Sequence, residues 1–198
     1  MEVGEQRVRL IAGTLGGRRI SAPRGTATRP TSDRVREAVF SALETLDAFD
    51  GATVLDAFAG SGALGLEALS RGAAYVTFVD SSAQAASVVR SNIESLGVQS
   101  SATVVSGDVN GLASRAALPG APFSLLFLDP PYKLDKFKVR RLIESLVESG
   151  GLTAETLVVW EHATSTTIEW PEGLAPVRDK RYGDTTVSIA RYEEGEVR

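Results

Sequence analysis

From residue 52 onward, short apolar runs alternate with segments whose apolar residues recur every three or four positions. Short apolar runs between turn residues are typical of strands, and the longer period is typical of helices that bury one face. The run Phe-Ser-Leu-Leu-Phe-Leu at 123–128 is apolar almost throughout, which indicates a strand covered on both faces. The pattern predicts five strands separated by helices, at residues 53–56, 75–80, 102–106, 123–128 and 157–160.

Glycines mark where the predicted helices end. One helix is expected to stop near Arg71 with Gly72 as its C-cap, a second at Gly97, and a third at Gly150-Gly151. Glycine is favoured at such positions because the chain leaves a helix most readily in a left-handed conformation. Strands and helices that alternate in this way form an open, doubly wound α/β sheet of the Rossmann-like kind.

Both flanks depart from this alternation. After Pro171, residues 176–181 and 185–192 predict two strands joined by Tyr182-Gly183-Asp184, an antiparallel hairpin that brings the expected sheet to seven strands. Residues 7–11 and 18–21 predict a small N-terminal β-hairpin, followed by a loop over 22–31. An amphipathic helix is expected from there to about residue 47, with N-cap candidates Thr31, Ser32 and Asp33. We therefore expect a basic N-terminal arm and loop over residues 1–31 and the α/β domain over 32–198.

Composition excludes several classes of protein. The 198 residues are 43% apolar and 23% charged, which is ordinary for a globular chain and unlike a disordered or collagenous one. The chain has no cysteine and one histidine, His162, so we expect no zinc finger, iron–sulfur site, thiol nucleophile or other metal site. It has neither a membrane-length apolar run nor a secretory signal, and we expect a cytoplasmic protein without a membrane partner.

The net charge of −4 hides an uneven distribution. Residues 7–36 contain eight arginines and one acid, a net of +7, which leaves −11 on the rest of the chain. A basic arm on an acidic body suggests a polyanionic partner, although a solvated basic face is an equally good interpretation of charge alone.

Gly60-Ser61-Gly62-Ala-Leu-Gly65 lies between a predicted strand and a predicted helix. Glycines at this spacing let the backbone turn tightly and approach a ligand closely, and Asp80 ends the next strand 20 residues after Gly60, where an acid can accept both ribose hydroxyls. The pair indicates an adenosine-containing ligand. Asp56 precedes the loop and favours S-adenosylmethionine over NAD, because a carboxylate attracts the cationic methionine moiety and repels a pyrophosphate.

Two further motifs follow predicted strands. Asp108 follows the third strand, where it can accept from an adenine amine or cap the helix that starts at Val109; both interpretations stay open. Asp129-Pro130-Pro131-Tyr132 follows the fourth strand. The prolines fix the backbone, so that a carboxylate and a rigid carbonyl can hold the two hydrogens of an amine, while Tyr132 offers a face on which a base can stack. Such a site suits methyl transfer to an unpaired or flipped nucleobase.

These motifs resemble those of the class I, S-adenosylmethionine-dependent methyltransferases that methylate amines, and the ordered set resembles the RsmD-type enzymes over residues 7–192. Besides the Asp-Pro-Pro-Tyr motif, the resemblance rests on Arg9-Leu-Ile-Ala-Gly13, Gly16-Gly17-Arg18, Arg29-Pro-Thr-Ser-Asp-Arg-Val-Arg-Glu37, Asp56-Ala-Phe-Ala-Gly-Ser-Gly62 and Tyr182-Gly-Asp-Thr185. The family methylates the exocyclic N2 of one guanine in bacterial 16S rRNA. The resemblance therefore implies that activity, a 16S rRNA substrate in an assembling small ribosomal subunit, and ribosomal proteins as indirect partners. Nothing in the sequence demands an oligomer, and we expect a monomer.

The resemblance also implies roles for individual residues. The catalytic motif is Asp129, Pro130, Pro131 and Tyr132. The expected cofactor site consists of Asp56, Phe58, Gly60, Ser61, Gly62, Asp80, Ser81, Asp108, Val109 and Thr31. The expected RNA contacts are Arg7, Arg9, Arg18, Arg19, Arg29, Arg34, Arg36 and Lys133.

Three other functions remain open from the sequence. An amino-methyltransferase of DNA or of a protein amide needs the same chemistry, although 198 residues leave little room for a separate DNA-recognition domain. A non-catalytic RNA-binding module is disfavoured by the intact Asp-Pro-Pro-Tyr motif. An NAD-dependent oxidoreductase is the weakest alternative, since no anion clamp for a pyrophosphate is evident.

Overall fold

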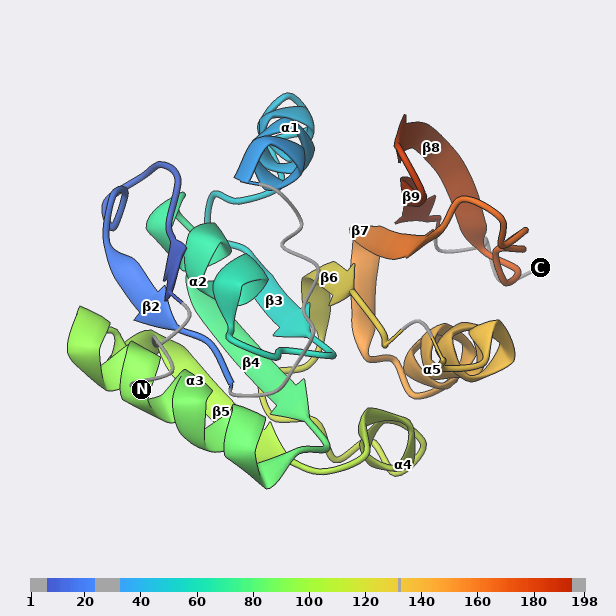
Figure 1. Cartoon of the computed structure of the whole chain (residues 1–198). Helices are drawn as coiled ribbons and strands as arrows, with labels where there is room; N and C mark the ends of the chain where they lie inside the picture. Colours follow the sequence, from blue (N-terminus) through green and yellow to red (C-terminus); the bar gives the residue numbers. More distant parts are fainter. Residues whose placement is uncertain (1–6, 24–32, 132, 194–198) are drawn as a thin grey trace.

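The computed structural model describes residues 7–23, 33–131 and 133–193. The strands of the main sheet are β3 (Thr53–Asp56), β4 (Tyr75–Asp80), β5 (Ala102–Ser106), β6 (Phe123–Leu128), β7 (Leu152–Ala163), β8 (Leu174–Tyr182) and β9 (Thr185–Tyr192). Within the described residues they form one seven-stranded sheet in the order β5-β4-β3-β6-β7-β9-β8 (Figure 1). The first five strands in that order are parallel, and β9 is antiparallel to both of its neighbours. The predicted α/β sheet with an antiparallel C-terminal hairpin is confirmed.

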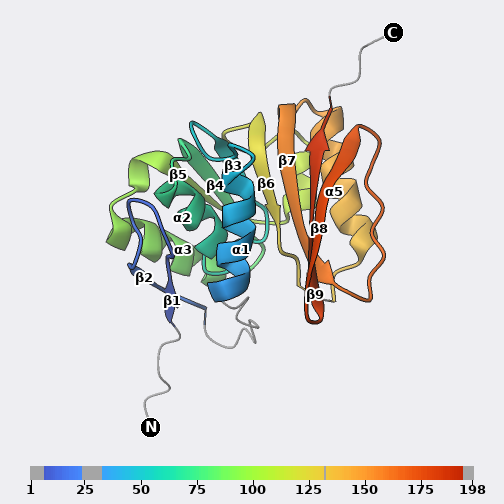
Figure 2. The same ribbon diagram turned by 90° about the horizontal axis from the view of Figure 1, so that it is seen from above.

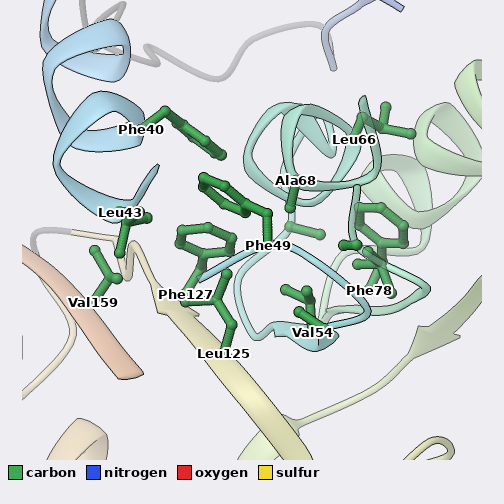
Figure 3. Close-up of a cluster of buried hydrophobic side chains, with 14 of the residues drawn as sticks. Phe40, Leu43, Phe49, Val54, Leu66, Ala68, Phe78, Leu125, Phe127 and Val159 are labelled. Carbon is green, nitrogen blue, oxygen red and sulfur yellow. The ribbon is translucent and has the colours of Figure 1, made fainter. Parts of the chain in front are cut away.

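Helices cover both faces of the sheet. They are α1 (Asp33–Glu44), α2 (Ala63–Ser70), α3 (Ala83–Leu96), α4 (Val109–Ala113) and α5 (Lys136–Glu148), with a 3-10 turn at Gln99–Ser101. Helices α1, α2 and α3 bury their apolar residues against one face, and α4 and α5 against the other. We call these two clusters of buried side chains the α1–α3 core and the α4–α5 core. Aromatic rings fill the centre of the α1–α3 core, where Phe40 stacks on Phe49 and contacts Phe127 (Figure 3).

The two largest differences between the observed and the expected bounds are at β7 and at the end of α1. Strand β7 extends beyond the predicted residues 157–160 at both ends, because it pairs with β6 on one side and with the long strand β9 on the other. Helix α1 ends at Glu44 rather than near residue 47, and the chain after it closes in a turn with Asp47 at a φ of 52°. The bounds of β3, β4, β5 and β6 agree with the prediction.

The N-terminal hairpin is packed onto the body of the protein. Its strands are β1 (Arg7–Arg9) and β2 (Arg19–Ser21), and they lie beside α2 and α3 (Figure 2). Leu10 and Ile20 are fully buried and belong to the α1–α3 core. Gly13 comes so close to α2 that a Cβ there would overlap the Ser70 carbonyl, so this turn requires glycine. The expected arm therefore shares its core with the sheet.

A buried carboxylate holds this hairpin in place. Glu67 of α2 has no exposed surface, and its oxygens accept from the backbone N–H groups of Ile11 at 2.7 Å and Ala12 at 3.0 Å. The Arg71 guanidinium donates to the same carboxylate at 2.9 Å and bridges onward to Glu44. Ser70 holds the hairpin through two further hydrogen bonds, since its hydroxyl accepts from the N–H of Leu15 and donates to the Ala12 carbonyl.

None of the helices in the described ranges is both long and apolar enough to cross a bilayer.

Replacing Glu67 by alanine is expected to destabilise the fold by about 3–5 kcal/mol, because the buried Arg71 side chain and two backbone N–H groups lose their acceptor. Chemical denaturation measures this free energy of unfolding. Glu94→Ala on α3 is the matched control, since Glu94 is exposed, and it should change stability by less than about 0.5 kcal/mol. Equal effects of the two substitutions would show that the carboxylate does not hold the hairpin.

Candidate active site

Carboxyl groups at the ends of two neighbouring strands hold the glycine loop by accepting hydrogen bonds from its backbone. Asp80 Oδ2 accepts from the N–H of Gly60 at 2.8 Å, and Asp80 Oδ1 accepts from the N–H of Ser82 at 2.8 Å. Gly60 and Gly62 adopt φ values of 53° and 80°, which other residues adopt only with strain. A Cβ on Gly60 would contact no other atom, so glycine is favoured at this position by its positive φ and not by lack of space.

Asp56 is buried beneath the glycine loop, whereas the sequence predicted that it faces the cofactor. Its side chain is 1% exposed, and its Oδ2 accepts from the N–H of Gly65 at 3.0 Å. Burial raises the pKa of Asp56 to about 7, and the charges of Asp129 and Asp80 act in the same direction while the Gly65 N–H opposes them. The predicted direct contact of Asp56 with a cofactor is therefore not what the structure shows: the carboxyl supports the loop from the protein interior.

Asn92 of α3 connects the loop to the N-terminal hairpin. Its amide nitrogen donates to the carbonyls of Ser61 and Ser21, both at 2.9 Å, and its amide oxygen accepts from the N–H of Ser21 at 2.9 Å. The side chain is 3% exposed, so these bonds are shielded from water. Nothing in the pattern of the sequence marks Asn92 out, because it occupies an ordinary helical position between the apolar residues of α3.

A cleft of about 550 Å³ opens at the carboxyl ends of the parallel strands. This volume falls within the range of small-molecule sites. Five predicted residues line it: Phe58, Ser81, Asp108, Val109 and Pro131. Asp108 also caps α4, accepting from the N–H groups of Asn110 and Gly111, so the capping interpretation is confirmed.

Helix α5 supplies a wall of this cleft that the sequence pattern did not predict. Phe137, Lys138 and Arg141 line it, and Leu134 and Asn110 complete the lining together with Ala57 and Gly107. Phe137 is 63% exposed, which is unusual for an aromatic residue on an amphipathic helix. Its position in the first turn of α5, beside lysines at 136 and 138, was the available signal.

The Asp-Pro-Pro motif begins where β6 ends, at the same edge as the cleft. Asp129 as a whole residue is exposed. The protein around its carboxyl group displaces water, and this desolvation raises the pKa of Asp129. Pro130 and Pro131 also line a small cavity of about 40 Å³ against the end of β7. Lys133 is exposed beside the motif. Tyr132 lies outside the described residues.

The expected RNA-contacting arginines divide into two groups. Arg7, Arg9, Arg18, Arg19 and Arg34 have exposed side chains, and Arg18 donates to the Ser95 carbonyl. Arg36 is 4% exposed and donates to the Arg9 carbonyl and to Asp33. Its burial leaves no surface for a phosphate, so the prediction that Arg36 contacts RNA is wrong: it joins α1 to the hairpin. Arg29 and Thr31 lie outside the described residues.

Comparisons with known proteins agree with this geometry. The model of the family described as "Conserved hypothetical protein 95" matches residues 8–191. The chain belongs to this family. It is the RsmD-type family that the motifs predicted.

Several members are known by name or structure. The ribosomal RNA small subunit methyltransferase D of Escherichia coli K12 is 35% identical over 80% of this chain and 76% of its own length. The Haemophilus influenzae protein of the same name is 31% identical over 94% of this chain and 93% of its own. The solved structure of the E. coli protein yhhF is 32% identical and superposes with a TM-score of 0.81 over 96% of this chain and all of its own.

The edge where the cleft opens fits S-adenosylmethionine, the cofactor of this methyltransferase family. Asp108 lines the cleft, Asp80 ends β4, and Asp129 follows the end of β6 at the same edge. Carboxylates at this edge favour a cationic sulfonium and ammonium over a pyrophosphate. Among the described residues, no cluster of His, Asp and Glu side chains is suited to a metal ion.

Asp56 should make stability depend on pH. The folded chain keeps this carboxyl protonated up to about pH 7, whereas its ordinary pKa is 3.8, so the unfolded chain ionises first. The free energy of unfolding is therefore expected to fall as the pH rises through this interval, by at most about 1.4 kcal/mol per pH unit.

Asp56→Asn tests this, because the amide keeps an oxygen for the Gly65 N–H and cannot ionise. Denaturation midpoints measured from pH 4 to pH 8 should show a flatter profile for the variant than for the wild type. The control is Asp50→Asn, which removes an exposed carboxylate. Parallel profiles for the wild type and Asp56→Asn would show that Asp56 does not carry this proton.

Proposed function

We propose that this chain transfers a methyl group from S-adenosylmethionine to the exocyclic N2 amine of a guanine in 16S rRNA. The observation that carries the proposal is the placement of Asp129 and Pro130 at the end of buried strand β6, at the edge where the cofactor cleft opens. The names of the relatives support ribosomal RNA of the small subunit as the substrate class. The resemblance of the motifs supports guanine N2.

The motif prepares a weak nucleophile. An exocyclic amine conjugates its lone pair with the ring, and hydrogen bonds from its two N–H groups to the Asp129 carboxylate and the Pro130 carbonyl favour a more pyramidal nitrogen. The cofactor, when bound, supplies an electrophilic methyl group on a sulfonium. The two prolines fix the backbone of the acceptors, so that orientation is established before the reaction. As nitrogen gains carbon it must lose one proton, and the Asp129 carboxylate accepts that proton.

The exposed arginines of the hairpin supply the electrostatic contact with RNA. Arg7, Arg9, Arg18 and Arg19 lie on a rigid, packed element, and the Asn92 bridge connects that element to the glycine loop. A flipped guanine must leave its base pair to reach the motif. We propose a monomer that acts on rRNA in an assembling small subunit, with ribosomal proteins as indirect partners.

Asp129→Ala is expected to lower the rate of methyl transfer by at least about 100-fold, because the amine loses an acceptor and the departing proton loses its base. Transfer of labelled methyl to rRNA, DNA and protein fractions measures this, with mass spectrometry to locate the modified base. Asp179→Ala on β8 is the matched control, since Asp179 is exposed and strands β7 and β9 separate β8 from β6. Cofactor affinity, measured by calorimetry, should be retained in both variants. Full activity of Asp129→Ala, or label found only in DNA or protein, would refute the proposal.

We expect weaker RNA binding when four arginines are changed to glutamate: Arg7, Arg9, Arg18 and Arg19. The logarithm of the binding constant should also fall less steeply with the logarithm of the salt concentration. The slope should change by about one unit for each phosphate that the protein no longer neutralises. Binding of the cofactor should not change. Arg90→Glu, on the exposed side of α3, serves as the single-charge control. An unchanged salt slope in the fourfold variant would return the hairpin to a solvated basic face.

A further inference from the structure

Glu161 lies beside the catalytic motif on the neighbouring strand. Leu128 at the end of β6 pairs with Trp160 of β7, so Asp129 and Glu161 each follow a paired residue on adjacent parallel strands. Adjacent strands are about 4.8 Å apart. Glu161 is half-buried. The end of β7 therefore lies next to the acceptors that hold the target amine.

The alternation of side chains along β6 shows which face Asp129 continues. Leu125 and Phe127 pack in the α1–α3 core, and Leu126 and Leu128 pack in the α4–α5 core. Asp129 is two residues beyond Phe127, which places it on the α1–α3 face. Asp56, whose N–H donor comes from α2 on that face, has its pKa raised by the charge of Asp129, in agreement with this placement.

The same alternation along β7 places Glu161 on the same face. Leu157 and Val159 pack in the α1–α3 core, and Trp160 packs in the α4–α5 core. His162, the residue after Glu161, lies on the other face with Trp160, and their ring centroids are 6.1 Å apart. The Nε2 of His162 contacts the Ser188 hydroxyl at 3.0 Å. Across the sheet Glu161 pairs with Val187, which also belongs to the α1–α3 core. Two carboxylates from adjacent strands thus share one face at one edge.

The bases that carry an exocyclic amine differ in the ring atom beside it. In guanine the amine on C2 lies between N1–H, a donor, and N3, an acceptor. In adenine and in cytosine the only ring nitrogen next to the amine-bearing carbon is an acceptor with a free lone pair. A carboxylate on the N1 side of the amine therefore accepts a hydrogen bond from guanine and repels the other two bases.

We propose that Glu161 is the residue that selects guanine, by accepting the N1–H of the target base while Asp129 and the Pro130 carbonyl hold its amine. This inference rests on the proposed function and adds the physical basis of its base choice. Glu161 contacts the base at N1, an atom that does not react. Loss of the Glu161 carboxylate should therefore alter discrimination between bases more than it alters the rate of the chemical step.

The test replaces the target guanine in an rRNA fragment by 2-aminopurine, which keeps the amine but has an unprotonated ring nitrogen in place of N1–H. Wild-type protein should prefer guanine. In Glu161→Gln, whose amide can either accept or donate, the ratio of kcat/KM for guanine over 2-aminopurine should fall by about ten- to a hundredfold. Comparing the ratio in the two proteins cancels the other differences between the two bases.

Glu155→Gln is the matched control, because it removes a carboxylate from the far end of the same strand, where Glu155 pairs with Arg191 at the surface. Its ratio should equal that of the wild type. Calorimetry should give Glu161→Gln the cofactor affinity of the wild type. Should the glutamine variant fail to fold, Glu161→Asp decides, since a carboxylate shortened by one methylene should lose rate on guanine and keep its rate on 2-aminopurine.

The possible outcomes separate this inference from the proposed function. A ratio unchanged in Glu161→Gln, or an equal loss on both bases, overturns the assignment of Glu161 while leaving guanine N2 methylation intact. An absence of guanine methylation by the wild-type protein overturns the proposed function itself. A collapsed ratio in Glu161→Gln, with the control unchanged, supports both.

Discussion

The glycine loop depends on two carboxyl groups that come from the ends of neighbouring strands. Asp80 holds the N–H of Gly60 and Asp56 holds the N–H of Gly65, so the loop is fixed at its start and at the first turn of α2. Because β3, β4, β5 and β6 are parallel, their ends meet at one edge, and the cleft and the Asp-Pro-Pro motif open there together. The positions of the glycine loop, the cleft and the Asp-Pro-Pro motif follow from this one support.

The N-terminal hairpin is joined to the same support from the other side. Glu67 fixes the turn of the hairpin to α2, and Asn92 holds the end of β2 and the glycine loop with one amide group. The arginine-bearing hairpin and the glycine loop thus share one hydrogen-bonded framework. Movement of the hairpin away from the body would break buried hydrogen bonds on both α2 and α3.

Much of the fold follows from local patterns, and the site follows less completely. Short apolar runs closed by Gly, Pro or Asp defined β3 to β6 correctly, because β3, β4 and β6 are buried over most of their length and β5 is half-buried. The length of β7 depends on pairing with β9, a partner that local periodicity does not reveal. The motif spacing predicted Asp56, Asp80 and Asp129 at strand ends, and the parallel strands bring those ends to one edge of the sheet. The burial of Arg36 and the α5 wall of the cleft depend on how separate elements pack, and no spacing along the chain encodes that.

The order of strands has a consequence for how the chain folds during synthesis. Strand β9 lies between β7 and β8, yet it follows every other strand of the sheet along the chain. Until residues 185–192 have left the ribosome, β7 presents an unpaired edge beside the apolar side chains of Val158 and Val159. Exposed strand edges of this kind recruit other chains. A nascent chain stalled before β9 is thus the form of this protein most exposed to aggregation.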